Sequence, residues 1–327
     1  MYFCTYINIL PTGIMTISED FYQKETRQGY TISSEMKEVW AVSLEMTQQL
    51  IEVCQRHGLQ CWIDSGTLLG AVRHGGFIPW DDDIDFVMLR KDYDKLVSVA
   101  AKEFKPPYFF QTTYSDNDYF CGHGQLRCSG TTSLSLNELS RQYHRGIFID
   151  IFVLDGFIEN PLLRFFHRTA TMVLKKVIRG KLRHKDENIS LGKKIVAILS
   201  KGICRAVPYR TLFRWYEALF RCVDADTHQR VSVISYKYST HRRIRLRSSY
   251  EQMEWIPFEG IKLPAPNNTD DALRCYFGAD YMTPRKEPTA HGEKYLDGRR
   301  PYEEVADLLR EHPELFDERI QRLYHCK

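Results

Sequence analysis

A cluster of acidic residues opens an apolar run near residue 85, and this pattern limits what the chain can fold into. Four carboxylates stand within five positions and apolar residues follow them, in the order Asp81-Asp82-Asp83-Ile84-Asp85-Phe86-Val87-Met88-Leu89. The alternation predicts a strand in which Asp83 and Asp85 project from one face, while Ile84 and Phe86 project from the other. Carboxylates this close repel one another and resist ionising together, so the fold has to neutralise them.

A single acid, Asp150, lies in a second apolar run over residues 146–154. A lone charge within such a strand is costly unless it has a partner. A hard divalent cation, Mg²⁺ (or Mn²⁺), explains both observations, because it takes carboxylate oxygens together with water and substrate phosphates. We therefore predict that Asp83, Asp85 and Asp150 hold a metal and, through it, a phosphate. The alternative is a solvated acidic loop, which is the usual setting of an isolated run of three aspartates.

A turn, Ser65-Gly66-Thr67, precedes the acids at a predicted junction between a strand and a helix. Backbone N–H groups and a helix N-terminus at such a junction can bind phosphate oxygens. Glycine turns are common, so the turn indicates a phosphate site only in combination with the acids that follow it.

The hydrophobic periodicity and the turn residues predict an α+β chain without repeats. The expected elements are a helix over 35–57, a strand over 59–63, a short helix over 68–73, a strand over 84–89, a helix over 92–104, strands over 108–113, 125–128 and 146–154, basic amphipathic helices from Pro161 to about 222, and a proline-rich tail with a last helix near 302–310. The same reading divides the chain into an N-terminal extension (1–32), a catalytic core (33–156), a basic helical segment (157–250) and a C-terminal segment that completes the active site (251–327).

Charge is distributed unevenly. The net charge is only +3, so we do not expect the chain to bind nucleic acid as a polycation. Residues 161–215, however, hold 14 Lys and Arg against two acids, a net +12. This segment either steers anionic donors or glycans, or lies on an anionic membrane, or forms ordinary solvated helix faces. The apolar stretch 195–199, flanked by lysines, would suit a peripheral membrane contact.

The cysteines and the apolar stretches indicate a cytoplasmic protein. Nine cysteines, an odd number without a CxxC pair, read as reduced thiols. We assign Cys121, His123 and Cys128 structural positions, because a fourth zinc ligand is missing. The first residues lack the basic start and the cleavage site of a signal peptide. No uncharged apolar stretch approaches the roughly 18 residues of a membrane span, so we expect no transmembrane helix.

Several blocks of this sequence resemble the LicD family, which includes the fukutin-related proteins. The blocks are DSGTLLGAVRHGGFIPWDDDIDFVM (64–88), QLRCSGTTSLSLNE (125–138), RGIFIDIFVLDGF (145–157) and YFGADYMTPRKEPTAHG (276–292). The resemblance implies the nucleotidyltransferase fold, a small mixed sheet with flanking helices. It also implies a turn at Ser65-Gly66-Thr67, a metal-binding pair at Asp83 and Asp85, and a third acid at Asp150. Thr67 stands where the superfamily usually has serine and keeps the hydroxyl.

The resemblance further implies a function. Members of this family are expected to transfer phosphocholine or a sugar-alcohol phosphate from a CDP-linked donor to a glycan hydroxyl, releasing CMP. The acceptor would be a cell-surface glycan, free or lipid-linked. Asp150 would either complete the metal site or take the proton of the acceptor hydroxyl, and these roles compete because a metal lowers the pKa of a carboxylate.

The family-like blocks suggest further site residues. Arg73 and Arg127 are candidates to clamp phosphate oxygens, and Trp80 is a candidate to stack on cytosine or to cover a choline cation. His74 and His291 are weaker candidates as donors to phosphate. From the last block, Tyr276, Gly278 and Asp280 are candidates to shape the acceptor side.

Three other functions fit the same acids. A glycosyltransferase also uses a DxD motif, but it would need a nucleotide-binding domain upstream, and only about 80 residues precede Asp83. A nucleotidyltransferase would use the same three acids and attack a different phosphorus. A non-catalytic member would bind glycans without turnover, against which the intact acids argue.

Overall fold

The fold is α+β, as the sequence predicts. The structure is a computed structural model that describes residues 7–9, 15–117, 119–181, 191–239, 241–286 and 292–326. Its helices are α1 (Ser34–His57), α2 (Ser65–His74), α3 (Arg90–Glu103), α4 (Pro161–Lys181), α5 (Leu191–Ala206), α6 (Tyr209–Arg221), α7 (Thr269–Phe277), α8 (Tyr302–Glu311) and α9 (Glu314–Tyr324). Its strands are β1 (Ile7–Ile9), β2 (Met15–Ile17), β3 (Glu25–Arg27), β4 (Tyr30–Ile32), β5 (Trp62–Ile63), β6 (Asp85–Leu89), β7 (Tyr108–Gln111), β8 (Gly124–Cys128), β9 (Thr132–Leu134), β10 (Phe148–Gly156), β11 (Arg230–Ser232), β12 (Ile244–Leu246), β13 (Met253–Phe258), β14 (Ile261–Pro266) and β15 (Tyr295–Asp297).

A mixed sheet of seven strands forms the centre, and β10 is its axis. The main order is β12-β11-β10-β6-β5, and β8 joins β10 while β7 joins β8. β6 and β10 run parallel, whereas β8 and β11 run antiparallel to β10. Because β10 is buried along its whole length, it reads as the continuous apolar run that a central strand requires.

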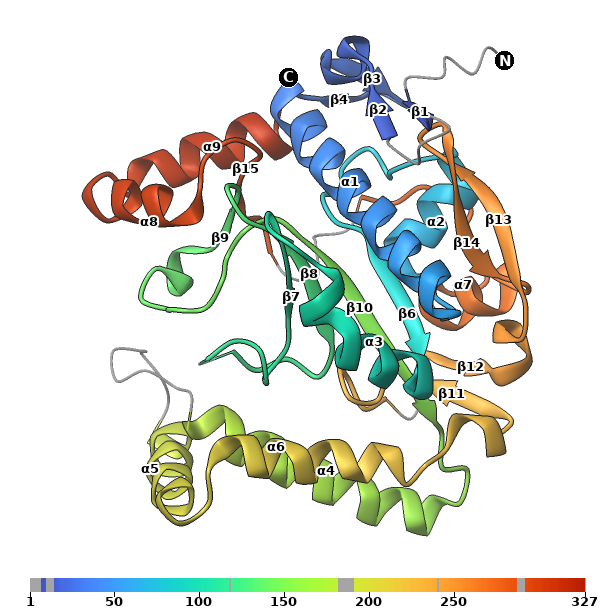
Figure 1. The fold of residues 1–327 in the computed structure, drawn as a ribbon, viewed down its shortest axis with the longest axis vertical. Helices are drawn as coiled ribbons and strands as arrows, with labels where there is room; N and C mark the ends of the chain where they lie inside the picture. Colours follow the sequence, from blue (N-terminus) through green and yellow to red (C-terminus); the bar gives the residue numbers. More distant parts are fainter. Residues whose placement is uncertain are drawn as a thin grey trace.

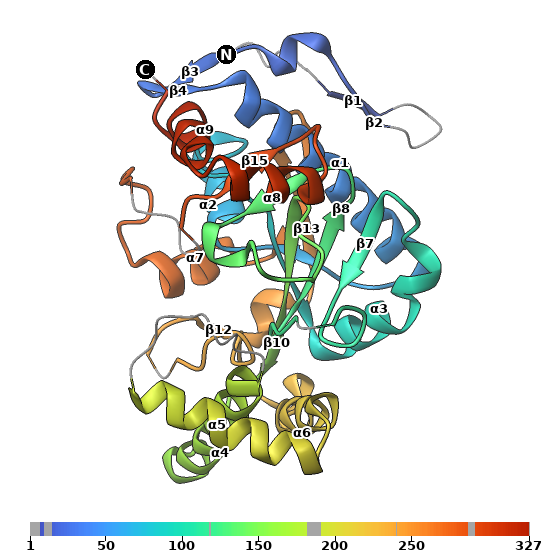
Figure 2. The ribbon, with the colours of Figure 1, turned by 90° about the vertical axis from the view of Figure 1, so that its left-hand side faces the viewer.

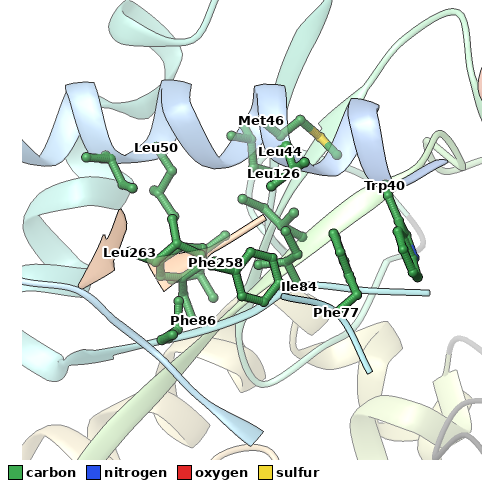
Figure 3. Close-up of a cluster of buried hydrophobic side chains, with 14 of the residues drawn as sticks. Trp40, Leu44, Met46, Leu50, Phe77, Ile84, Phe86, Leu126, Phe258 and Leu263 are labelled. Carbon is green, nitrogen blue, oxygen red and sulfur yellow. The ribbon is translucent and has the colours of Figure 1, made fainter. Parts of the chain in front are cut away.

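Helix α1 covers one face of this sheet and builds the main core (Figure 1). Ser33 caps its first turn, accepting a bond from the Met36 N–H at 3.1 Å, and Gly58 ends it in the left-handed conformation with φ of 63°. Figure 3 shows α1 side chains meeting those of β6, β8 and the β13–β14 pair. Trp40 stacks on Phe77 with ring centroids 4.4 Å apart. This packing fixes which face of β6 is apolar, and so directs its acids away from the core.

The helices α4, α5 and α6 form a separate layer at one end of the molecule, and α8 and α9 lie near the other (Figures 1 and 2). The predicted basic helices between Pro161 and residue 222 are therefore confirmed. A small apolar cluster joins this layer to the sheet and contains Ile178, Phe213, Tyr216 and Phe220. Within the described residues, no helix is both long and apolar enough to cross a bilayer.

The proline-rich tail differs from its prediction, because part of it is regular structure. Pro257, Pro264 and Pro266 lie in β13 and β14, which pair only with each other. Proline lacks an N–H donor and is tolerated in such edge strands, although in sequence it indicates a loop. Helices α7 and α9 were also not predicted. The last predicted helix, near 302–310, is α8.

Candidate active site

The three predicted acids meet at the end of two neighbouring parallel strands. β6 and β10 pair so that Asp85 lies directly opposite Asp150, and the Asp150 N–H donates to the Ile84 carbonyl at 2.9 Å. One carboxylate oxygen from each of Asp83, Asp85 and Asp150 lies within 4.8 Å of the other two. Ile84 and Phe86 are fully buried in the main core. The alternation along β6 thus separates an acidic face from an apolar one.

The electrostatics of this acidic cluster fit a cation. Burial, together with the charges of Asp83 and Asp150, raises the pKa of Asp85 well above its usual range. Such a cluster carries repulsion that a divalent ion would remove. Carboxylate oxygens are the ligands that Mg²⁺ and Mn²⁺ favour. The residues present therefore fit a hard divalent cation.

A second acidic group adjoins the first. Asp81, Asp82 and Asp83 also place carboxylate oxygens within 4.8 Å of one another. Asp82 is buried and accepts a hydrogen bond from the hydroxyl of Tyr324 in α9. This contact gives Asp82 a structural task, because it ties the acidic loop to the C-terminal helices.

The turn before the acids is held tightly. Ser65 begins α2 with φ of 47°, a left-handed conformation that is uncommon outside glycine. A Cβ atom on Gly66 would lie 2.4 Å from Oδ2 of Asp81, so only glycine lets the turn approach the acids this closely. Helix α2 begins within the turn rather than after it, which extends the predicted helix to Ser65–His74.

Two hydrogen bonds hold this turn in place. The Thr67 hydroxyl accepts the Asp85 N–H at 2.8 Å and so joins α2 to β6. Asp64, just before α2, accepts a bond from Nη2 of Arg245 on β12 at 2.7 Å, and both side chains are buried. Thr67 is itself buried and lines neither of the two cavities described below; in the structure its hydroxyl positions Asp85.

Two cavities flank the acids. The larger, about 460 Å³, has the turn and Asp83 and Asp85 on one wall, and a group of cationic side chains elsewhere on its lining: Arg73, Lys237, Arg242, Arg243 and Arg285. The smaller, about 200 Å³, is lined by all three acids, by His123 and by aromatic rings that include Tyr236. Acids that can hold a cation and a cationic wall that can hold an anion face one space, which is the arrangement that a metal-bound phosphate ester requires.

Some of the other predicted site residues line the larger cavity, and others do not. Arg73 and Trp80 line the larger cavity, as do Ser65 and Gly66. His74 lies beside Arg73, and burial lowers its pKa to about 4. From the last family-like block, Tyr276 and Asp280 line the larger cavity, whereas Gly278 does not. His291 lies outside the described residues.

Arg127, the second predicted phosphate clamp, lies apart from both cavities. Its side chain is buried and lines neither cavity. Its guanidinium donates to Gln111, to the Gly146 carbonyl at 2.7 Å and to Oε1 of Gln125 at 2.5 Å. Gln125 in turn donates from Nε2 to Oδ1 of Asp150 at 2.7 Å. In the structure, Arg127 therefore orients the amide that holds Asp150.

His123 and Gln125 are site residues that the sequence did not reveal. Nε2 of His123 lies 2.8 Å from Oδ1 of Asp150, and Sγ of Cys121 lies 3.1 Å from Nδ1 of the same ring. Burial alone would lower the pKa of His123, but the charges of Cys121 and Asp150 raise it to about 10. A protonated imidazolium then holds Asp150 from one side and Gln125 holds it from another. The alternation of Gln125 and Arg127 on a short strand was the available signal.

Comparisons with known proteins agree with this geometry. The family model described as LicD/FKTN/FKRP, nucleotidyltransferase domain, matches residues 58–181, which include all three acids. The lipopolysaccharide cholinephosphotransferase LicD of Haemophilus influenzae is 30% identical over 252 residues, which cover 76% of this chain and 91% of that protein. The human ribitol 5-phosphate transferase FKRP is 40% identical over 59 residues, 18% of this chain and 12% of its own.

Proposed function

The chain belongs to the LicD/FKTN/FKRP family, and on that premise we propose that it is a metal-dependent phosphotransferase. Its donor would be a CDP-linked alcohol, carrying either phosphocholine or a sugar-alcohol phosphate, and its acceptor a hydroxyl of a cell-surface glycan. The observation that carries the proposal is the acidic cluster of Asp83, Asp85 and Asp150 facing a cationic cavity wall. The named relatives transfer cholinephosphate and ribitol 5-phosphate, which supports this class of donor.

The proposed reaction breaks the phosphoanhydride bond of the donor and forms a phosphate ester with the acceptor. The acceptor oxygen bonds to the distal phosphorus of the donor, the bond from that phosphorus to the CMP oxygen breaks, and CMP leaves with the electron pair. Asp83, Asp85 and Asp150 would hold Mg²⁺ or Mn²⁺, which when bound neutralises the diphosphate and the departing CMP. Arg73, Arg243 and their cationic neighbours would orient the phosphates, since guanidinium groups match phosphate oxygens in pairs.

Asp150 has two candidate tasks in this proposal. It either completes the metal site or accepts the proton of the acceptor hydroxyl, because it faces the smaller cavity beside the other acids. His123 and Gln125 fix the same oxygen, Oδ1. Their contacts set the direction of the carboxylate before a ligand arrives, which serves either task.

We place this reaction in the cytoplasm. The cysteines whose side chains the structure describes are free thiols, which supports a reducing compartment. CDP-linked donors would meet the enzyme there.

The test is product analysis. We would incubate the protein with Mg²⁺ or Mn²⁺, a panel of CDP-alcohols and candidate glycans, and follow nucleotide release and acceptor mass by mass spectrometry. We expect CMP from one CDP-alcohol, and a loss of at least about a hundredfold in rate for Asp83→Asn and for Asp85→Asn. Asp307→Asn, the same substitution on the exposed face of α8, is the matched control and should keep full activity.

Each alternative function has its own product. UDP or GDP released from a nucleotide sugar would assign a glycosyltransferase. Pyrophosphate released from CTP would assign a nucleotidyltransferase. Tight glycan binding without any nucleotide product, with all donors and glycans present, would assign a non-catalytic member and refute the proposal.

A further inference from the structure

Exposed apolar side chains gather on one face of the helical layer. Of the seventeen large apolar side chains that are exposed in the described residues, twelve lie between 162 and 215 and eleven of them on α4 and α5. Phe165 is 63% exposed, Phe166 62% and Ile198 70%. Scattered single apolar residues are normal on a protein surface, but a concentration of this kind marks an interaction site.

The apolar residues follow the helical period, so they form continuous stripes. On α5, Leu191, Ile195, Ile198 and Leu199 lie near one side of the helix. Helix α4 carries an exposed group over residues 162–173, while its other side buries Ile178 in the cluster shared with α6. We call the exposed side of these two helices the α4–α5 face.

The charge on this face is entirely of one sign. The sequences of α4 and α5 contain ten Lys and Arg and no Asp or Glu. Arg168, Lys176, Lys181 and Lys194 are exposed along it. Apolar stripes bordered by cations match the interface of a bilayer with anionic headgroups. A second copy of the same face would instead oppose like charges, which disfavours self-association.

The helical layer is fastened to the wall of the active site. Nζ of Lys175 donates to the Tyr236 carbonyl at 2.6 Å, and the Tyr238 hydroxyl lies 2.8 Å from Nδ1 of His167. The same loop, which precedes β12, supplies Lys237 and Arg243 to the larger cavity. Figure 2 shows β12 between the helical layer and α7. A surface that holds α4 in place therefore also sets the position of this cavity wall.

We propose that the α4–α5 face docks on an anionic phospholipid bilayer, with its apolar stripes among the acyl chains and its Lys and Arg at the headgroups. The docked layer holds the cationic cavity wall near the membrane. For its acceptor, this inference rests on the proposed phosphotransferase: the glycan acceptor would be lipid-linked and presented at the membrane surface. Docking itself needs no turnover, so the two proposals can fail separately.

The test is binding to vesicles, measured by flotation and by light scattering. The full chain is mixed with vesicles of phosphatidylcholine alone, or of phosphatidylcholine with phosphatidylglycerol, at low and high salt. We expect binding to the anionic vesicles only, weakened by salt. The double variants Phe165→Ser/Phe166→Ser on α4 and Ile198→Ser/Leu199→Ser on α5 should each bind at least about tenfold more weakly.

Further variants test the role of the charges and provide a control. Neutralising Lys176→Gln and Lys194→Gln should weaken binding about fivefold for each charge removed. The control Leu136→Ser/Trp255→Ser removes two apolar side chains that are 46% and 42% exposed but lie off this face, and should bind as the parent does. Circular dichroism checks that every variant is folded, and having one variant on each helix protects the test against the misfolding of either.

Several results would overturn the proposal. The first is no binding to anionic vesicles by the parent protein. The second is equal binding to neutral vesicles, which would remove the role of the cations. The third is a dimer in solution that the Phe165→Ser/Phe166→Ser variant abolishes, since a second copy would then cover this face. Activity on a water-soluble acceptor has no bearing on these outcomes, and reports on the phosphotransferase alone.

Discussion

The buried pair of Asp64 and Arg245 joins the turn at Ser65 to the sheet, and its removal gives the sharpest test of the structure. Arg245 on β12 is 1% exposed and Asp64 is 2% exposed, with Nη2 and Oδ2 at 2.7 Å. Arg245→Met keeps most of the side-chain volume and removes the charge. Asp64 is then left as a buried carboxylate without its cation.

The expected magnitude follows from this burial. Removing one partner of a buried ion pair costs about 3–5 kcal/mol in the free energy of unfolding, because the remaining charge loses solvation without compensation. Arg274 and Asp270 on α7 provide a matched control, with a similar separation of 2.6 Å but both side chains more than half exposed. Water solvates each partner there, so Arg274→Met should leave stability nearly unchanged.

The assay is urea unfolding, followed by circular dichroism, of five proteins: the parent, Asp64→Asn, Arg245→Met, the double variant and the control Arg274→Met. The double variant should be more stable than Arg245→Met by at least about 1 kcal/mol, because the stranded charge is gone. Phosphotransfer should also fall in Arg245→Met, since Asp64 precedes the turn at Ser65. If Arg245→Met is as stable to urea as the control Arg274→Met, the buried pair does not stabilise the turn and the reasoning fails.

Two other predictions concern the turn and a histidine away from it. Gly66→Ala should lower activity more than about tenfold with little change in stability, because the added Cβ displaces the Asp81 carboxylate, which is the end of a side chain and can turn aside. Gly192→Ala on α5, where a Cβ meets nothing within 4 Å, should keep full activity; CMP release and urea unfolding would check both variants. Burial, aided by nearby arginines, lowers the pKa of His144 to about 4, so the unfolded chain binds its proton first as the pH falls. Stability should therefore drop by about 1.5 kcal/mol between about pH 6.5 and 5, and His144→Asn should remove that part of the loss; an unchanged pH profile in this variant would contradict the assignment.

The acidic half of the site could be predicted because local rules govern it. Asp83 and Asp85 share a face through the two-residue period of a strand. Asp150 stands out as the lone charge in an apolar run, and the parallel register then places it opposite Asp85. The prediction of α1 succeeded for similar reasons, since its period and both caps are written in adjacent residues.

Apart from Arg73, the cationic half could not be predicted, because no local pattern reports it. Lys237, Arg242 and Arg243 lie more than 150 residues beyond Asp83, in a loop that tertiary packing alone brings to the cavity. Arg127 shows the opposite difficulty. Its place in a family-like block suggested a ligand contact, but sequence does not say whether an arginine on a strand faces a cavity or the interior. Here its partners are the internal acceptors around Gln125.

These two halves imply that the site is complete only when distant segments have packed together. The family model covers residues 58–181, which carry the acids and the turn. The cationic loop before β12 lies outside that range, and so does Arg245, which holds Asp64. A chain with the acids alone would retain the mutual repulsion that raises the pKa of Asp85, without the cavity wall that binds an anion. Because Lys175 fastens this loop to α4, whatever orders the helical layer also assembles the cationic side of the site.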